Sequence, residues 1–211
     1  MNGITLPMAL VDFIPVGLFV ASAVVLQRDL YNKMSKGSFA LLAAGTIMII
    51  MAGFYKALWK LLYALAVCDF VALNSLFFPL QTTGFVITAI SLIALLTANQ
   101  GKNTLYSAGA LPVAYTSSMI FVILTVLGTL GICGCLAVMA ARMKKKGAIF
   151  IFALAFVFMM AMGYLSSRDF TQASMHWVAQ FTNIMGQGAL LLGILQLRKA
   201  GLKNPDALKK G

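Results

Sequence analysis

Four polar side chains on one face of the last apolar segment are the residues best suited to chemistry. They recur at helical spacing, as His176, Gln180, Asn183 and Gln187. Residues spaced in this way share one face of an α-helix, and the segment 172–197 is long enough to cross a bilayer. A polar stripe inside a membrane must face other helices or water. Because amides both donate and accept hydrogen bonds, the stripe predicts a binding site for a small polar solute or, alternatively, hydrogen bonds between helices.

A second polar group lies in the first half of the chain. Asn74 and Gln81 are separated by two helical turns and share a face, with Pro79 between them. Proline removes a backbone donor and can break a helix, and broken helices beside polar side chains form binding sites in many transporters. We therefore predict that Asn74 and Gln81 bind substrate together with the stripe. A short turn between two spans would explain the same residues.

Two aspartates interrupt apolar segments and are predicted to take part in proton coupling. They are Asp12, near the start of the chain, and Asp69. A carboxylate inside a bilayer is costly, so such residues commonly belong to ion or proton pathways. His176 is the only histidine, and it could relay a proton or lie at the membrane interface.

The remaining residues do not predict an enzyme or a cofactor site. The sequence lacks nucleophile elbows, Walker loops and zinc-protease motifs, and one histidine with five aspartates leaves little for hydrolytic chemistry. The three cysteines lie inside apolar segments, and neither they nor the 13 methionines converge at metal-ligand spacing. We expect no catalytic residues, no metal and no cofactor.

Composition assigns the chain to the membrane proteins. It is 61% hydrophobic and only 10% charged, whereas soluble domains carry about 25% charged residues. Long uncharged runs predict an all-α polytopic membrane protein, with a single transmembrane helical bundle over 1–197 and a short basic cytoplasmic tail over 198–211. The net charge of +11 comes mostly from clusters beside apolar segments, which indicates membrane topology and not nucleic-acid binding.

The apolar segments predict a seven-helix bundle. The expected spans are 5–27, 37–55, 56–73, 80–97, 113–141, 147–165 and 172–197. The third contains Lys56, Lys60 and Asp69, so it could instead be an amphipathic helix in the interface, leaving six spans. The uncharged N-terminus and the basic cluster after the first span favour seven spans with the N-terminus outside. Both alternatives place the C-terminus in the cytoplasm.

The spans on either side of the fourth resemble two variants of one unit. Lys36 and Lys146 each follow a basic cluster, precede a glycine and open an apolar span. The separation between Asn74 and Asn183 along the chain is nearly the same as the separation between Lys36 and Lys146. A genuine repeat would give a parallel 3+1+3 arrangement with a transport site at the seam between the two units. Such features also recur by chance in helical bundles.

That arrangement is similar to the SWEET and PQ-loop transporters. The similarity rests on Lys33, Ser35 and Gly37 after the first span, where those families have a Lys-x-Ser stretch, and on Asn74 and Asn183. The resemblance implies one asparagine from each half at a sugar site, as in SWEETs. This chain lacks their Pro-Gln dipeptide and has no proline in the fifth and sixth spans. The resemblance is therefore one of overall plan and not of membership.

These observations favour a small multi-spanning transporter or channel for a small polar solute, with its site at the seam between two three-helix units. The alternative is a membrane-embedded sensor or accessory subunit that binds a ligand, a lipid or a partner protein. An integral membrane enzyme is less favoured. We expect membrane lipid and the polar solute as partners and no nucleic acid, and the sequence leaves a homo-oligomer open. The expected location is the plasma membrane or a bacterial inner membrane.

Overall fold

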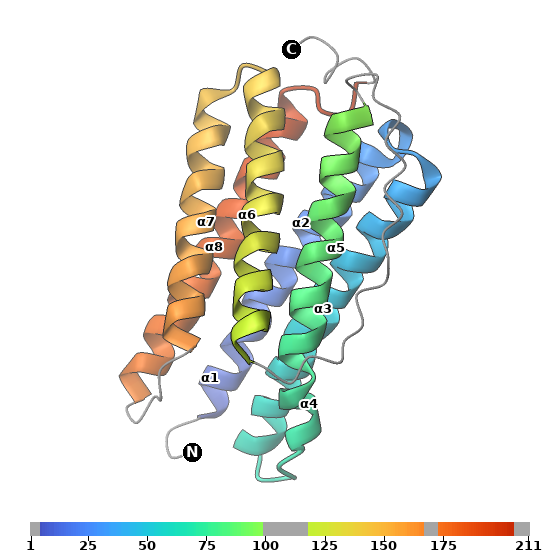
Figure 1. Ribbon diagram of the computed structural model, residues 1–211. Helices are drawn as coiled ribbons and strands as arrows, with labels where there is room; N and C mark the ends of the chain where they lie inside the picture. The colour runs from blue at the N-terminus through green and yellow to red at the C-terminus, as the bar shows by residue number, and fades with distance from the viewer. Residues whose placement is uncertain (1–4, 99–117, 167–172, 205–211) are drawn as a thin grey trace.

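The computed structural model describes residues 5–98, 118–166 and 173–204, and these form a bundle of helices without strands (Figure 1). In order, its elements are α1 (Leu6–Val11), α2 (Phe13–Leu30), the short 3-10 helix η1 (Tyr31–Lys33), α3 (Lys36–Ala64), α4 (Val71–Ser75), α5 (Phe77–Ala98), α6 (Ser118–Arg142), α7 (Lys146–Ser166) and α8 (Ala173–Lys199). Six stretches of the described chain are long and apolar enough to cross a membrane, the first of them made of α1, α2 and η1 together. The chain is thus an all-helical protein with the make-up of a multi-pass membrane bundle.

The predicted third span, 56–73, is wrong. α3 continues without interruption through Lys56 and Lys60 and ends at Ala64, because this part of the sequence has no proline or glycine and is rich in strong helix formers. The chain then turns and forms the five-residue helix α4. The alternative of one interfacial helix over 56–73 is not formed either. Pro79 lies in the first turn of α5, where proline is tolerated, so it does not break that helix.

The long helices form two sets of three, and the direction of the helices alternates in the same way in both sets. α2, α3 and α5 make up the first set, and α6, α7 and α8 make up the second. Within each set the first and third helices point one way and the second points back (Figure 1). α5 and α6 pack side by side and run in the same direction. As a result, α1 begins at one end of the bundle and α8 ends at the other.

Positive charge is concentrated at the end of the bundle where α2 and α8 finish, which we call the basic end. The described Lys and Arg residues there are Arg28, Lys33, Lys36, Arg142, Lys144, Lys145, Lys146, Arg198, Lys199 and Lys203. The Lys33 ammonium donates a hydrogen bond to the Leu202 carbonyl, which joins the end of α2 to the chain just after α8. In the described chain, only Lys56 and Lys60 lie toward the opposite end, which we call the far end.

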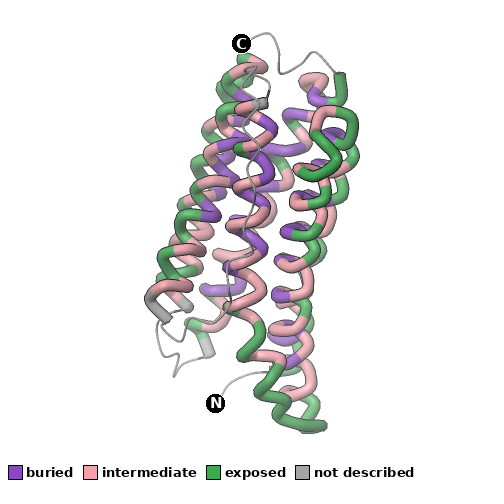
Figure 2. Tube along the Cα trace, turned by 45° about the vertical axis from the view of Figure 1, so that its right-hand side comes forward, coloured by how far each residue is buried: buried purple, intermediate pink, exposed green. Residues whose placement is uncertain are grey.

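Small residues bring α3 and α5 into close contact. A Cβ atom added to Gly45 would lie 2.8 Å from the Thr88 backbone nitrogen and 2.9 Å from the Gly84 carbonyl oxygen. Lipid supplies no hydrophobic force between helices, so close packing of this kind is a main source of their association. The buried residues accordingly face the middle of the bundle, while exposed residues, mostly apolar along the helices, face outward (Figure 2).

Candidate functional site

A cavity of about 660 Å³ lies between the two sets of helices. Each of the six long helical stretches contributes to its wall, which is mainly apolar. The polar residues in the wall are Asp12, Lys56, Lys60, Gln81, Thr125, Thr129, Tyr164, Asn183 and Gln187. Cavities of about 300–1,000 Å³ with a few polar groups are typical of small-molecule sites. This cavity is therefore the candidate functional site.

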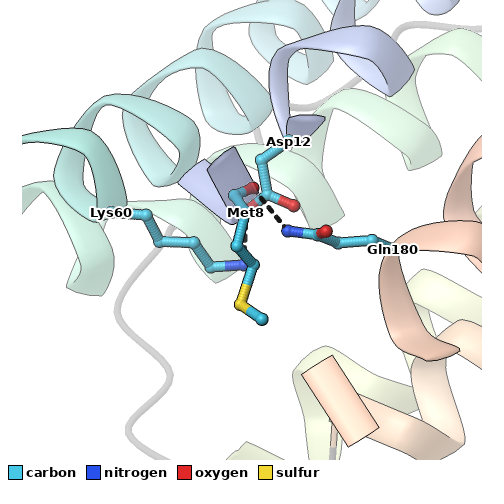
Figure 3. Close-up of polar contacts among 4 residues, drawn as sticks. All are labelled: Met8, Asp12, Lys60 and Gln180. Atoms are coloured by element: carbon cyan, nitrogen blue, oxygen red, sulfur yellow. Dashed lines mark hydrogen bonds and ion pairs between the residues drawn. The ribbon is translucent and has the colours of Figure 1, made fainter. Parts of the chain in front are cut away.

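The structure divides the predicted polar stripe of α8 into two parts. Asn183 and Gln187 line the cavity, and the Gln187 Oε1 is buried without a hydrogen-bond partner in the described chain. Gln180 is buried against α1 instead, where its Nε2 donates to the Met8 carbonyl oxygen at 2.6 Å (Figure 3). His176 is half-buried and is not among the residues that line the cavity. One face of α8 thus serves both as a helix contact and as part of a cavity wall.

The polar pair predicted in the first half of the chain, Asn74 and Gln81, is also divided. Gln81 of α5 lines the cavity, across from the second set of helices. Asn74 lies on α4, is half-buried and does not line the cavity. Since α5 starts at Phe77, the two side chains belong to different helices and do not share the single face that their spacing predicted. The structure therefore brings Gln81 together with Asn183 and Gln187, but not with Asn74.

The two aspartates have different surroundings. Asp12 separates α1 from α2, lines the cavity and forms an ion pair with Lys60 of α3 (Figure 3). The side chains of Lys60 and Asp12 are only 16% and 13% exposed, so much of this pair is shielded from solvent. Asp69 is exposed in the turn before α4, where it accepts a hydrogen bond from the Trp59 indole nitrogen at 2.9 Å. Of the two predicted proton-coupling residues, only Asp12 reaches the cavity.

Lys56 lies one helical turn from Lys60 and also lines the cavity. Its ammonium nitrogen is 4.0 Å from the centre of the Phe77 ring, close enough for a cation–π contact. Asp12 is the only acidic residue of the described chain in the cavity wall, and it pairs with Lys60. With two cations and one anion, the far end of the cavity carries a net positive charge.

Polarity changes with depth in the cavity. Asp12 at the start of α2 and the lysines near the end of α3 mark the far end. Gln187 and Thr129 lie farther along their helices, toward the middle of the bundle. Beside the wall, the Thr82 and Thr125 hydroxyls are 2.7 Å apart and link α5 to α6. The cavity thus has a charged end, followed by an apolar interior with scattered amides and hydroxyls.

Lys56 and Lys60 were missed as site residues in the sequence analysis. Their partner Asp12 is distant in sequence, so spacing could not reveal the ion pair. A signal was nevertheless present, because two lysines one turn apart in an apolar segment are costly in lipid and default to a functional site. A predicted span that begins at Lys56 hides this signal, because it places both lysines at the start of a separate helix.

The arrangement can bind a molecule by hydrogen bonds to amides and by contact with apolar side chains, with charge available at one end. Among residues 5–98, 118–166 and 173–204 there is no group of three or more His, Cys, Asp or Glu that could hold a metal ion. Comparisons of this chain with known protein families, with curated proteins and with solved structures found no match.

Proposed function

We propose that the protein is a small multi-spanning membrane transporter or channel for a small polar solute, and that the cavity between the two sets of helices is its solute site. The observation that carries the proposal is the convergence of Gln81, Asn183 and Gln187 from both sets on one cavity. Polar side chains inside a membrane belong at helix contacts or beside water and solute. Gln187 lines the cavity, and its Oε1 has no hydrogen-bond partner in the described chain.

The orientation follows from the charges. The basic end is assigned to the cytoplasm because cytoplasmic ends of membrane proteins are enriched in Lys and Arg. The far end, with Asp12 and Lys60, is then outside, as is the N-terminus, and the C-terminus is cytoplasmic. The common direction of the two sets supports a parallel repeat of three helices. The membrane is the plasma membrane or a bacterial inner membrane.

The native cysteines provide a test of this orientation. Cys68 is exposed in the turn between α3 and α4, whereas Cys133 and Cys135 are buried in α6. We expect a membrane-impermeant maleimide to label wild-type protein in intact cells at Cys68, and Cys68→Ser to abolish that labelling. Labelling of Cys68 only in inside-out vesicles would reverse the orientation.

Access to the cavity can be tested in a variant without native cysteines. A small charged methanethiosulfonate reagent is expected to modify Asn183→Cys, which lines the cavity, much faster than Gln180→Cys, which is buried against α1. Val157→Cys is the control on the outer face of α7, because Val157 is 60% exposed and would contact lipid, where the thiolate does not form. Equal rates at all three positions, or no reaction at Asn183→Cys, would count against a solute path.

Movement of solute is the decisive measurement. We expect proteoliposomes containing the wild-type protein to swell faster than protein-free liposomes when glycerol, xylitol or glucose is supplied outside. Gln187→Leu should slow the swelling about tenfold, since it removes a hydrogen-bonding group from the path at a cost of about 1 kcal/mol or more. A membrane-embedded sensor is the second candidate, favoured by the mainly apolar wall. Binding of a ligand without any movement of solute would select it.

A further inference from the structure

Lys56 is a cation in the cavity wall that lacks an ionic partner within the described chain. Its ammonium nitrogen lies 4.0 Å from the centre of the Phe77 ring. The one carboxylate in the wall, on Asp12, is paired with Lys60. A charge within a bilayer-spanning bundle is costly unless it is paired. The free ammonium of Lys56 therefore marks the place where an anionic group from outside the chain would be most strongly stabilised.

The remainder of the cavity is suited to an apolar group. Beyond Lys56, toward the middle of the bundle, the wall contains large apolar side chains from five of the helices, including Phe19, Ile49, Phe85, Val126 and Met159. Burying an apolar chain against such a surface is favourable by about 25 cal/mol per Å². A fully hydrated inorganic anion would use the lysine but would gain nothing from these side chains.

We propose that the cavity binds an amphipathic anion, with its anionic head at the Lys56 ammonium and its apolar body between the Phe, Ile, Val and Met side chains. This inference rests on the proposed function of the cavity as a binding site, and it extends the class of ligand from small polar solutes to amphipathic anions. The amides of Gln81 and Asn183 lie in the same wall and fit polar substituents on that body. Phe77 and Lys60 flank the head.

The test is binding of two matched probes to wild-type protein in nanodiscs of phosphatidylcholine. Dansyl-labelled undecanoate carries the anionic head, and dansyl-labelled undecanol is its neutral counterpart; protein-free nanodiscs give the background for each. We expect the acid to bind about tenfold more tightly than the alcohol, as a charge-assisted hydrogen bond would give. Equal affinities for the two probes in the wild-type protein would overturn the proposal, whatever the variants do.

Variants of Lys56 show whether the preference arises at this side chain. Lys56→Gln is expected to lose the preference and to bind the two probes with equal affinity. Lys56→Arg should retain the preference because it keeps the charge. Lys36→Gln is the matched control, since Lys36 is an exposed lysine at the opposite end of the same helix. A preference for the acid that survives in Lys56→Gln would assign the anion to another site and refute the proposal.

Two sources could supply such an anion, and competition separates them. Displacement of the bound acid by decanoate in the buffer indicates a water-borne organic acid, while displacement by phosphatidylglycerol built into the nanodisc indicates an acidic lipid. Displacement by neither would contradict a site for amphipathic anions. Swelling assays on the same preparations keep the two proposals apart. Loss of swelling with retained anion preference refutes only transport, and swelling without anion preference refutes only the anion site.

Discussion

Replacement of Asp12 by asparagine is expected to lower the free energy of unfolding by about 3 kcal/mol, because removal of one member of a buried ion pair leaves the other charge uncompensated. In this variant Lys60 loses its carboxylate while Lys56, one turn away, remains. Two unpaired ammonium groups would then face each other at the far end of the cavity. The change is isosteric, so the loss would come from charge and not from packing.

A double variant identifies the cause. Asp12→Asn with Lys60→Met removes both charges and should be clearly more stable than Asp12→Asn alone, since replacing a whole buried pair with neutral groups is often close to neutral. Asp69→Asn is the control, because Asp69 is exposed and accepts only one hydrogen bond, from Trp59, in the described chain. Denaturation in detergent micelles, followed by circular dichroism, gives the free energies of unfolding of these three variants and of Lys60→Met alone. If the losses from the single changes simply add in the double variant, the ion pair contributes nothing specific.

Gly45→Val is expected to lower the free energy of unfolding by about 3 kcal/mol or to prevent folding altogether. Overpacking a tight helix contact costs about 1–3 kcal/mol, and here the atoms in the way belong to the backbone. The new side chain would meet the Thr88 nitrogen and the Gly84 carbonyl oxygen, each less than 3 Å from its Cβ. Neither atom can move away without separating α3 from α5. The cavity wall formed by these two helices would be disturbed as well.

Gly134→Val provides the matched comparison. Gly134 lies within α6 and a Cβ added there would meet no atom within 4 Å. Both variants exchange a helical glycine for the same residue, so differences in helix propensity cancel. Yield of monodisperse protein on size-exclusion chromatography and the midpoint of thermal unfolding are the measurements. Similar values for the two variants would show that the contact between α3 and α5 is not tight.

The sequence predicts the helical membrane class well but not every boundary. Long uncharged runs can only be buried in lipid or in a core as helices, so the class follows from composition. The predicted span 56–73 is wrong because it starts a new helix at Lys56, whereas α3 continues to Ala64. In the structure they remain within α3, where the ion pair with Asp12 and the aromatic contact of Phe77 accommodate them. Such tertiary compensation cannot be seen in a single segment.

For the candidate site, periodicity predicts one polar face on α8 but not the two different surroundings of that face. Spacing predicts that Gln180, Asn183 and Gln187 point in similar directions. It does not show that α1 ends opposite Gln180 and offers the Met8 carbonyl there, while the cavity lies opposite the other two. Gln81, also predicted from the sequence as a site residue, lines the same cavity as Asn183 and Gln187. The charged end of the cavity required knowledge of which helices are neighbours.

The common direction of the two helix sets restricts how the cavity could open. Any rotation that relates one set to the other while preserving helix direction must have its axis along the bundle. Inverted repeats, related by an axis within that plane, can produce inward-open and outward-open states by exchanging conformations between their halves. That exchange needs two sets of opposite direction, which these helices do not form. In the proposed transporter, alternating access would therefore need two structurally distinct gates, and the Asp12–Lys60 pair at the charged end of the cavity is the candidate for one of them.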